Sequence, residues 1–176
     1  MYLTAGQYKG TKIDVPNGVK PTLSKVRQGV FNMLFSVCNY KTFLDMFAGS
    51  GLMSLEAYSR GYEVTSIEKN KSNIKIINSN FKKANCPYKP VNIDCLKFNT
   101  NEKFDIIYLD PPWDMDYCTI IKKAESLLNP DGVVVVEYDN QRNIDIDEIL
   151  KENNSKLSVL KNKKYGRCLI TLLHFG

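Results

Sequence analysis

The residues most suggestive of chemistry are Asp110–Trp113, which read Asp-Pro-Pro-Trp and directly follow the apolar run Phe104–Leu109. The Asp110 carboxylate can accept one N–H of an exocyclic amine on a nucleic-acid base. The Pro111 carbonyl can accept the other, because proline stiffens the turn and has no N–H of its own. Trp113 offers a flat face on which a base can stack, worth roughly 1–3 kcal/mol. We therefore predict a base-modifying site with the catalytic residues Asp110, Pro111, Pro112 and Trp113.

Such a site mainly has to orient a weak nucleophile, since the lone pair of a base amine is delocalised into the ring. An amine held in line with a strong electrophile gains effective concentration, up to ~10⁵–10⁸ M in favourable systems. A paired base would be hidden, so the target must be unpaired or flipped out. The alternative is a Pro-Pro loop whose tryptophan is buried for packing, and it weakens when the motif stands behind a cofactor loop.

A glycine-rich segment, Asp45–Gly51, supplies that loop between an apolar run and a helical pattern. Glycines there let the backbone turn tightly and let a ligand lie against it, although they could also serve the turn alone. A nicotinamide dinucleotide would need a third glycine where Ser54 stands, and a helix N-terminus for its pyrophosphate. S-adenosylmethionine has no phosphate and carries an α-amino group that Asp45 can bind. The acids Glu68 and Asp94 end the next two predicted strands and suit its ribose hydroxyls and adenine amine.

The sequence therefore predicts S-adenosylmethionine as cofactor. Its expected contacts are Asp45, Phe47, Ala48, Gly49, Ser50, Gly51, Glu68, Lys69, Asp94 and Cys95.

Composition excludes other kinds of site. The five cysteines (Cys38, Cys86, Cys95, Cys118 and Cys168) are scattered, and the one histidine, His174, ends the chain. This pattern argues against a metal site and against nucleophilic triads that need a histidine. The formal net charge of +5 favours an anionic partner, with lysines and arginines dense at both ends of the chain, although a lysine-rich solvated surface would give the same count. Without a signal-peptide layout or a membrane-length apolar run, we expect a cytoplasmic protein.

The elements that must position these residues alternate between strand and helix. Strands are predicted at Thr42–Phe47, Glu63–Glu68, Val91–Cys95, Phe104–Leu109, Val133–Val136, Leu157–Leu160 and Cys168–Phe175, and helices at Thr22–Val37, Leu52–Arg60, around Ile74–Phe81, Tyr117–Leu128 and Asp147–Lys151. This alternation indicates an α/β fold, a mostly parallel sheet with helices on both faces. The last two strands are joined by only Asn162–Gly166, so they should form an antiparallel hairpin.

We expect a single domain over residues 1–176. Residues 1–37 would form a small β-like arm and a helix, and residues 38–176 the catalytic sheet. The Asp-Pro-Pro-Trp motif ends the fourth predicted strand, so it should lie beside the glycine loop at the topological switch point, where open α/β sheets bind ligands.

Three segments together resemble one family, the RsmD-type guanine-N2 methyltransferases of bacterial small-subunit ribosomal RNA. They are the basic arm Ala5–Lys12, the segment Lys20–Leu34, and the Leu44–Gly51 block followed by Leu55–Gly61. The resemblance covers nearly the whole chain and implies a class I methyltransferase (Rossmann-like) fold with a seven-stranded sheet. Three positions depart from the family pattern: Lys20 replaces an arginine, Gln28 an acid, and Trp113 a tyrosine.

The resemblance also assigns roles. It implies that Glu68 contacts the cofactor ribose, Asp94 the adenine, and Asp110–Trp113 the target guanine. The implied partner is ribosomal RNA in the small subunit or a late assembly intermediate. We expect the protein itself to be a monomer, because nothing in the sequence suggests an obligate partner. We expect its phosphates to be bound by Lys9, Lys12, Lys20, Thr22, Lys25 and Arg27.

Two other functions stay open at this point. Asp-Pro-Pro-Trp is also similar to the motif of N6-adenine methyltransferases that act on RNA or DNA, although many of these place the motif before the glycine loop. A cofactor-binding but inactive assembly factor is the third interpretation, and the intact Asp110 and Trp113 argue against it.

Overall fold

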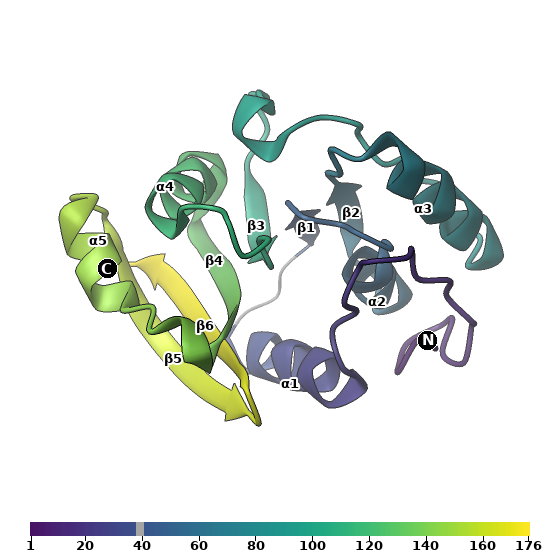
Figure 1. Ribbon diagram of the computed structural model, residues 1–176, viewed down its shortest axis with the longest axis horizontal. Helices are drawn as coiled ribbons and strands as arrows, with labels where there is room; N and C mark the ends of the chain where they lie inside the picture. The colour runs from purple at the N-terminus through teal and green to yellow at the C-terminus, as the bar shows by residue number, and fades with distance from the viewer. Residues whose placement is uncertain (38–40) are drawn as a thin grey trace. The chain divides into compact units, whose positions relative to one another are not determined.

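The computed structural model describes residues 1–37 and 41–176 (Figure 1). Residues 38–40 lie outside the described residues, and with them Cys38 and the predicted boundary between arm and sheet. The chain divides into two compact units, Met1–Phe98 and Asn99–Gly176.

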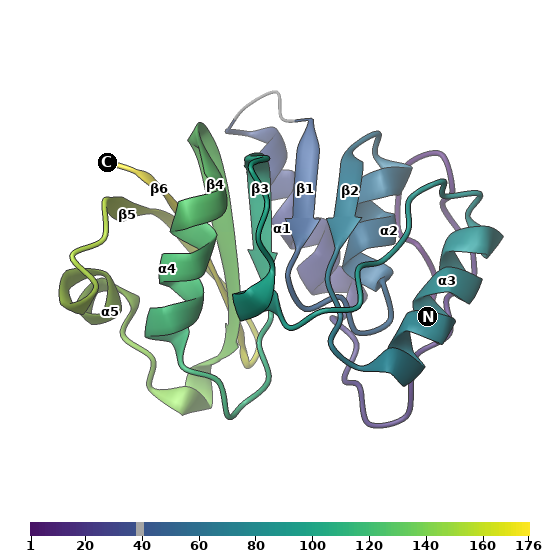
Figure 2. The ribbon, with the colours of Figure 1, turned by 90° about the horizontal axis from the view of Figure 1, so that it is seen from above.

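The first unit is built on two short parallel strands. β1 (Thr42–Asp45) pairs with β2 (Glu63–Ser66), from Thr42 opposite Glu63 to Asp45 opposite Ser66. The helix that connects them, α2 (Leu52–Ser59), packs on both strands and is buried along almost its whole length (Figure 2). Helices α1 (Ser24–Phe35) and α3 (Lys71–Lys83) belong to the same unit, which ends in the 3₁₀ turn η1 (Cys95–Lys97).

The arm at the N-terminus covers α2. It is a narrow loop closed by an antiparallel bridge between Tyr2 and Lys12, and it buries Leu3 and Ile13 in a cluster shared with α2 and α3. Contact with α2 is so close that a Cβ on Gly6 would lie 1.8 Å from the Ser59 carbonyl oxygen. The arm is therefore an integral part of the first unit.

The second unit holds four strands in the order β3-β4-β6-β5. β3 (Phe104–Leu109) and β4 (Leu128–Asp139) are parallel, whereas β6 (Cys168–Phe175) is antiparallel to both β4 and β5 (Leu157–Tyr165). Helix α4 (Tyr117–Leu127) packs on β4, and α5 (Ile146–Glu152) packs on β5. Between β4 and α5 lies a 3₁₀ turn, η2 (Asn140–Arg142).

The predicted α/β class and the antiparallel C-terminal hairpin are confirmed, but the described residues contain six strands and not seven. The strand predicted at Val91–Cys95 is reduced to one bridge between Ile67 and Val91. The Asn92 side chain donates to the carbonyl oxygens of Glu68 and Lys69, and the next residues turn into η1. Side-chain hydrogen bonds thus replace the backbone ladder that a longer strand would make.

The sequence Asn129-Pro130-Asp131-Gly132 is typical of a turn, but these residues are part of β4. Phe104 pairs with Leu128 and Ile106 with Val133, so one residue of β3 lies opposite four of β4 between these pairs. The extra residues bulge outward, which leaves Pro130 and Asp131 exposed while the ladder continues. β5 is also longer than predicted and reaches Tyr165.

Every helix in residues 1–37 and 41–176 is too short or too polar to cross a membrane. In the same residues, histidine, cysteine and acidic side chains do not gather in groups of three that could hold a metal ion.

Candidate cofactor and base sites

The predicted cofactor residues lie in the first unit, and the glycine loop is shaped by two left-handed positions. Gly49 has φ +54° and Gly51 φ +75°, conformations that L-residues with side chains rarely adopt. Gly51 caps α2, and a Cβ there would lie 2.9 Å from the Phe81 ring carbon Cε1. The close packing of α3 thus requires Gly51, while Gly49 sets the turn of the loop.

Glu68 follows β2 and fixes the loop from the other side. Its carboxylate is 9% exposed; Oε2 accepts from the Gly49 N–H at 2.9 Å and Oε1 from the Asn70 N–H at 2.7 Å. A carboxylate offers about four acceptor positions, so two remain for a ligand. Glu68 therefore both shapes the glycine loop and keeps acceptor capacity.

Asp45 ends β1 and lies 1% exposed behind the loop. Its Oδ2 accepts from the Ser54 hydroxyl at 2.8 Å, and the Ser66 hydroxyl donates in turn to Ser54 at 2.7 Å. Burial raises the pKa of Asp45 to about 6, with the nearby charge of Glu68 adding to it, against the hydrogen bonds from Ser54 and Phe47. These hydrogen bonds from Ser66 to Ser54 and from Ser54 to Asp45 were not predicted. The sequence pattern marks Ser54 only as the position where a dinucleotide-binding loop would have its third glycine.

The remaining predicted cofactor residues differ in what they offer. Asp94 is half-buried, and its Oδ1 accepts from the Leu96 N–H at 3.0 Å as the cap of η1. The Cys95 thiol is buried, and burial raises its pKa to about 11, so only the backbone of Cys95 is suited to a ligand contact. The side chain of Lys69 is exposed.

Asn80 of α3 is a further residue that the sequence did not reveal. It is fully buried, and its Nδ2 donates to the carbonyl oxygens of Ser50 (2.9 Å) and Asp14 (2.8 Å). The Asp14 N–H donates back to Asn80 Oδ1 at 2.9 Å. One amide therefore ties the N-terminal arm to the glycine loop. The only sequence signal that could have pointed to it is the position of this asparagine three residues after Ile77, on the apolar face of the helix.

The predicted base-binding residues lie in the second unit, where β3 ends. Asp110 is half-buried, Pro111 is buried, and Trp113 is 62% exposed. The Met115 N–H donates to the Pro112 carbonyl at 3.2 Å, which closes the turn before α4. An exposed tryptophan at the end of a parallel strand is available to a ligand, so the packing alternative for Trp113 is wrong.

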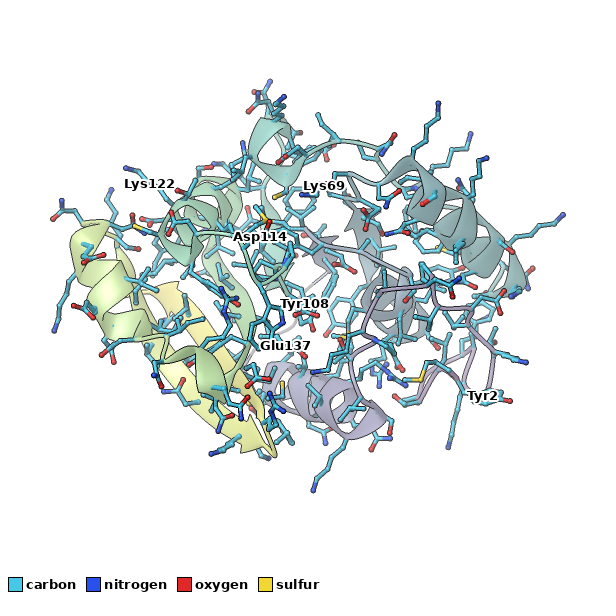
Figure 3. The ribbon with its side chains drawn as sticks, in the orientation of Figure 1. Tyr2, Lys69, Tyr108, Asp114, Lys122 and Glu137 are labelled. Atoms are coloured by element: carbon cyan, nitrogen blue, oxygen red, sulfur yellow. The ribbon has the colours of Figure 1, made fainter. Side chains whose placement is uncertain are left out.

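Two buried tyrosines support this loop. Tyr108, two residues before Asp110, donates its hydroxyl to the Glu137 carboxylate of β4, and the two side chains meet in Figure 3. Tyr117 begins α4, and its hydroxyl lies 3.4 Å from the Glu137 carbonyl. Burial raises the pKa of Tyr117 above its usual value.

The residues predicted to bind RNA phosphates fall into two groups. Lys9, Lys12, Lys20 and Lys25 are exposed. Arg27 is 1% exposed: its Nε donates to Glu56 Oε1 at 2.9 Å and its Nη2 to the Tyr2 carbonyl at 2.9 Å. Thr22 is buried as well, and its carbonyl accepts from Arg27. The phosphate-binding prediction is therefore wrong for Arg27 and Thr22, because both are buried and the Arg27 guanidinium joins α1 to the N-terminal arm and to α2.

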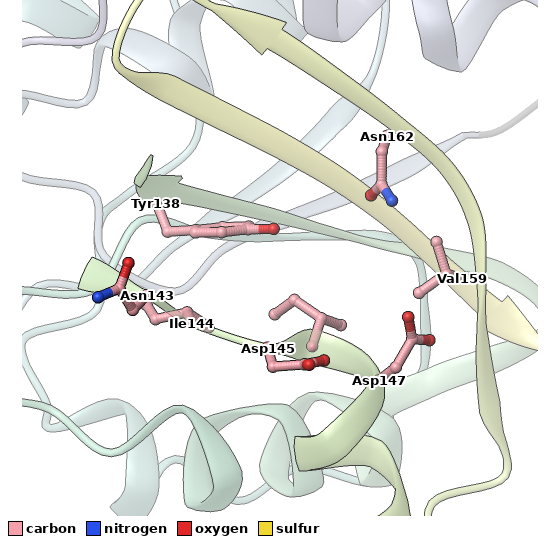
Figure 4. Close-up of a pocket in the computed structure, with 8 residues that line it drawn as sticks. Tyr138, Asn143, Ile144, Asp145, Asp147, Val159 and Asn162 are labelled. Atoms are coloured by element: carbon pink, nitrogen blue, oxygen red, sulfur yellow. The ribbon is translucent and has the colours of Figure 1, made fainter. Parts of the chain in front are cut away.

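A separate hollow of about 340 Å³ opens in the second unit between α5 and the sheet (Figure 4). Tyr138, Asp145, Asp147 and Asn162 are among its lining residues. None of the predicted site residues lines it.

Comparison with known proteins decides the family. Residues 1–174 match the sequence model of the family described as "Conserved hypothetical protein 95". The chain belongs to this family. It is 30% identical to the ribosomal RNA small subunit methyltransferase D of Haemophilus influenzae over 87% of this chain and 88% of that protein. The expected family is thereby confirmed, and with it the expected enzyme class of methyltransferase.

Solved structures agree on the fold. The structure of an Escherichia coli protein named as a methyltransferase superposes on this chain with a TM-score of 0.82 at 24% sequence identity. The alignment covers 98% of this chain and 96% of the Escherichia coli chain. An S-adenosylmethionine-dependent methyltransferase from Clostridium acetobutylicum covers 89% and 93%, with TM-score 0.76 at 12% identity. This chain therefore has the fold of the class I methyltransferases. Its relatives with this fold imply a mechanism that depends on S-adenosylmethionine.

Proposed function

We propose that this protein transfers a methyl group from S-adenosylmethionine to the exocyclic N2 amine of a guanine in small-subunit ribosomal RNA. The observation that carries the proposal is the family match over residues 1–174, which spans both units and includes Asp110–Trp113. The relative named ribosomal RNA small subunit methyltransferase D supports the RNA substrate. On the same ground we propose that the two units work as one methyltransferase domain.

The residues of the first unit fit S-adenosylmethionine by the chemistry of their donor set. The unit offers three carboxylate acceptors: Asp45 ends β1, Glu68 follows β2, and Asp94 caps η1. A ligand with ribose hydroxyls, an adenine amine and an α-ammonium group matches three carboxylates, whereas a pyrophosphate would be repelled by them. When bound, S-adenosylmethionine supplies an electrophilic methyl group on a sulfonium centre.

Within the proposal, Glu68 accepts from the ribose hydroxyls with its two remaining acceptor positions. Asp45 faces the α-ammonium group, and ionisation of its carboxylate is then favoured by the neighbouring positive charge. The loop Phe47–Gly51 lies along the ligand, with Gly49 held in place by Glu68. Asp94 accepts from the adenine amine, while Lys69 and the backbone of Cys95 complete the cofactor contacts.

The chemistry at the base belongs to the second unit. The Asp110 carboxylate accepts one N–H of the target amine and the Pro111 carbonyl accepts the other, so that the nitrogen lone pair is directed outward. Trp113, which is largely exposed, stacks on the base. The residues orient the amine and draw its protons, and orientation is the main requirement when the methyl donor is already reactive.

The test is transfer of labelled methyl from S-adenosylmethionine to unmodified small ribosomal subunits, with naked ribosomal RNA and duplex DNA alongside. Digestion and separation of the products identify the labelled base. Label on guanosine N2 from subunits supports the proposal. The absence of label from every substrate, with S-adenosylmethionine still bound, would instead support the inactive assembly factor.

A second candidate is N6-adenine methylation of RNA or DNA. It is favoured by one observation, the tryptophan at position 113 of an Asp-Pro-Pro-Trp motif. The same digest separates the two candidates, because label on adenine keeps the enzyme class and changes the substrate.

A further inference from the structure

Arg142 makes a concentrated set of contacts with the loop that carries Trp113. Its Nη2 donates to the Trp113 carbonyl at 2.7 Å, and its Nη1 to the Tyr117 hydroxyl at 3.1 Å. The guanidinium carbon also lies 5.6 Å from the centre of the Trp113 ring and 4.8 Å from that of Tyr117. A single side chain thus contacts both the backbone and the ring of the exposed tryptophan.

These contacts reach across 29 residues of sequence, from η2 back to the end of β3. η2 is itself anchored. The Asn140 N–H donates to the Arg167 carbonyl at 2.8 Å, and Arg167 Nη2 forms an ion pair with Asp139 Oδ2 at 3.1 Å. The hairpin between β5 and β6 therefore holds the turn from which Arg142 extends.

None of these contacts pairs the positive charge of Arg142 with an acidic side chain. The partners of its guanidinium in them are a carbonyl, a hydroxyl and two aromatic rings. A planar guanidinium can donate in two directions and stack at the same time, which a lysine ammonium cannot do. The arrangement suits a group that holds an aromatic platform in place.

We propose that Arg142 is a positioning residue for base recognition: it fixes the Trp113 ring in the orientation on which the target base stacks. The inference rests on the proposed function for the identity of the base. Its effect falls on binding of the RNA, because the contacts lie on the stacking residue and its backbone. Chemistry at the amine is left to Asp110 and Pro111.

Trp113 is the only tryptophan in the sequence, so its fluorescence reports this site without a label. We expect Arg142→Ala to increase acrylamide quenching of that fluorescence in the free protein by about twofold and to lower the quenching produced by naked small-subunit ribosomal RNA. In methyl transfer, KM for RNA should rise about tenfold with kcat changed by less than threefold. Arg142→Lys keeps the charge and loses the fork, so it should lie between wild type and Arg142→Ala in each measurement.

Lys122→Ala is the matched control, since it removes one exposed cation from α4 of the same unit (Figure 3). It should leave both the acrylamide quenching and KM near wild type. Unchanged acrylamide quenching in Arg142→Ala would overturn the inference, and so would RNA that fails to quench Trp113 in the wild-type protein. An unchanged KM in an active enzyme would do the same.

Failure of the proposed function gives a different pattern. A wild-type protein that methylates no RNA, yet shows RNA quenching that depends on Arg142, supports the positioning role and rejects the reaction. Loss of kcat alone in Arg142→Ala would reject the positioning role and retain the reaction.

Discussion

At the scale of single residues, Asp45 shows how burial prepares a group for a cationic ligand. Its pKa of about 6 means that the free protein holds the carboxyl partly neutral in mildly acidic solution. An unfolded chain would have an aspartate pKa of ~3.9. The folded state therefore binds the extra proton between about pH 4 and 6, and the stabilisation from this neutral form is lost as pH rises through the folded pKa.

Ligand binding should reverse that preference, because an α-ammonium group favours the ionised carboxylate. We expect the affinity for S-adenosylmethionine to be level above about pH 6.5 and to fall below pH 6, by up to roughly tenfold per pH unit. Isothermal titration calorimetry from pH 5 to 8 measures this. Asp45→Asn should bind more weakly and show a flat profile, whereas an unchanged slope in this variant would assign the proton to another group.

Asp110 carries a second prediction at this scale. Asp110→Ala removes an acceptor for the target amine but no acceptor from the first unit, so methyl transfer should fall by at least ~10²-fold while S-adenosylmethionine binding stays within about twofold. Single-turnover methyl transfer and calorimetry measure the two quantities. Joint loss of transfer and cofactor binding would mean that Asp110 belongs to the cofactor site.

At the scale of elements, the helices and the strands β3 and β6 could be predicted because hydrophobic periodicity and turn chemistry agree there. The loss of the strand predicted at Val91–Cys95 could not be foreseen. It depends on the Asn92 side chain, which donates to two carbonyls that only the fold brings near. The same holds for β4, in which Pro130 and Gly132 read as a turn. Pairing with β3 keeps these residues in the strand as a bulge.

The connection between the arm and the glycine loop gives a prediction about Asn80. Asn80→Ala removes the donor to Ser50 and Asp14 and leaves the buried Ser50 carbonyl unsatisfied, which costs about 1–3 kcal/mol of stability. Because Ser50 lies in the glycine loop, S-adenosylmethionine affinity should fall about three- to tenfold. Chemical denaturation and calorimetry test both effects. Asn78→Ala, on the exposed side of the same helix, is the control; equal losses in both variants would point to general damage to α3.

Arg27 links α1 to α2, and its prediction concerns stability. The Arg27–Glu56 pair is buried, with side chains 1% and 0% exposed. Removal of Arg27 leaves the buried Glu56 carboxylate with Arg60 as its remaining ionic partner, and breaking a buried pair costs up to about 3–5 kcal/mol. Arg27→Met should therefore lower the free energy of unfolding by several kcal/mol in a urea titration, while exposed Lys25→Met changes it by less than ~0.5 kcal/mol. A stable Arg27→Met protein with weaker RNA binding would restore the original phosphate-binding assignment.

At the scale of the whole molecule, the fold class could be predicted from the alternation of strands and helices. The family could be predicted from three segments, Ala5–Lys12, Lys20–Leu34 and Leu44–Gly51 with Leu55–Gly61, because their combined pattern is far more specific than the glycines alone. Supporting contacts could not be predicted. Ser54, Asn80 and Arg142 act through partners 9 to 66 residues away in sequence, and none of the three stands in a motif. Residue type also misled at Arg27, since an arginine in a basic segment can equally neutralise a buried acid.

The distribution of charge over the chain gives the last prediction. Lys9, Lys12, Lys20 and Lys25 are exposed on the arm and the start of α1, so they are free to meet an extended polyanion. Each phosphate that a lysine neutralises contributes roughly 0.7–0.9 to the slope of log K against log salt. Replacement of these four lysines by glutamine should therefore weaken binding of ribosomal RNA at low salt and reduce the slope by up to about 3. Filter binding between about 50 and 300 mM salt, roughly a sixfold range of ionic strength, measures this slope. A control with Lys71, Lys75, Lys82 and Lys122 replaced by glutamine lowers the formal net charge of +5 by the same four units from exposed positions elsewhere. If the salt slope falls by the same amount in both variants, RNA binding depends on total charge. If it falls only in the first variant, phosphate binding is assigned to the arm.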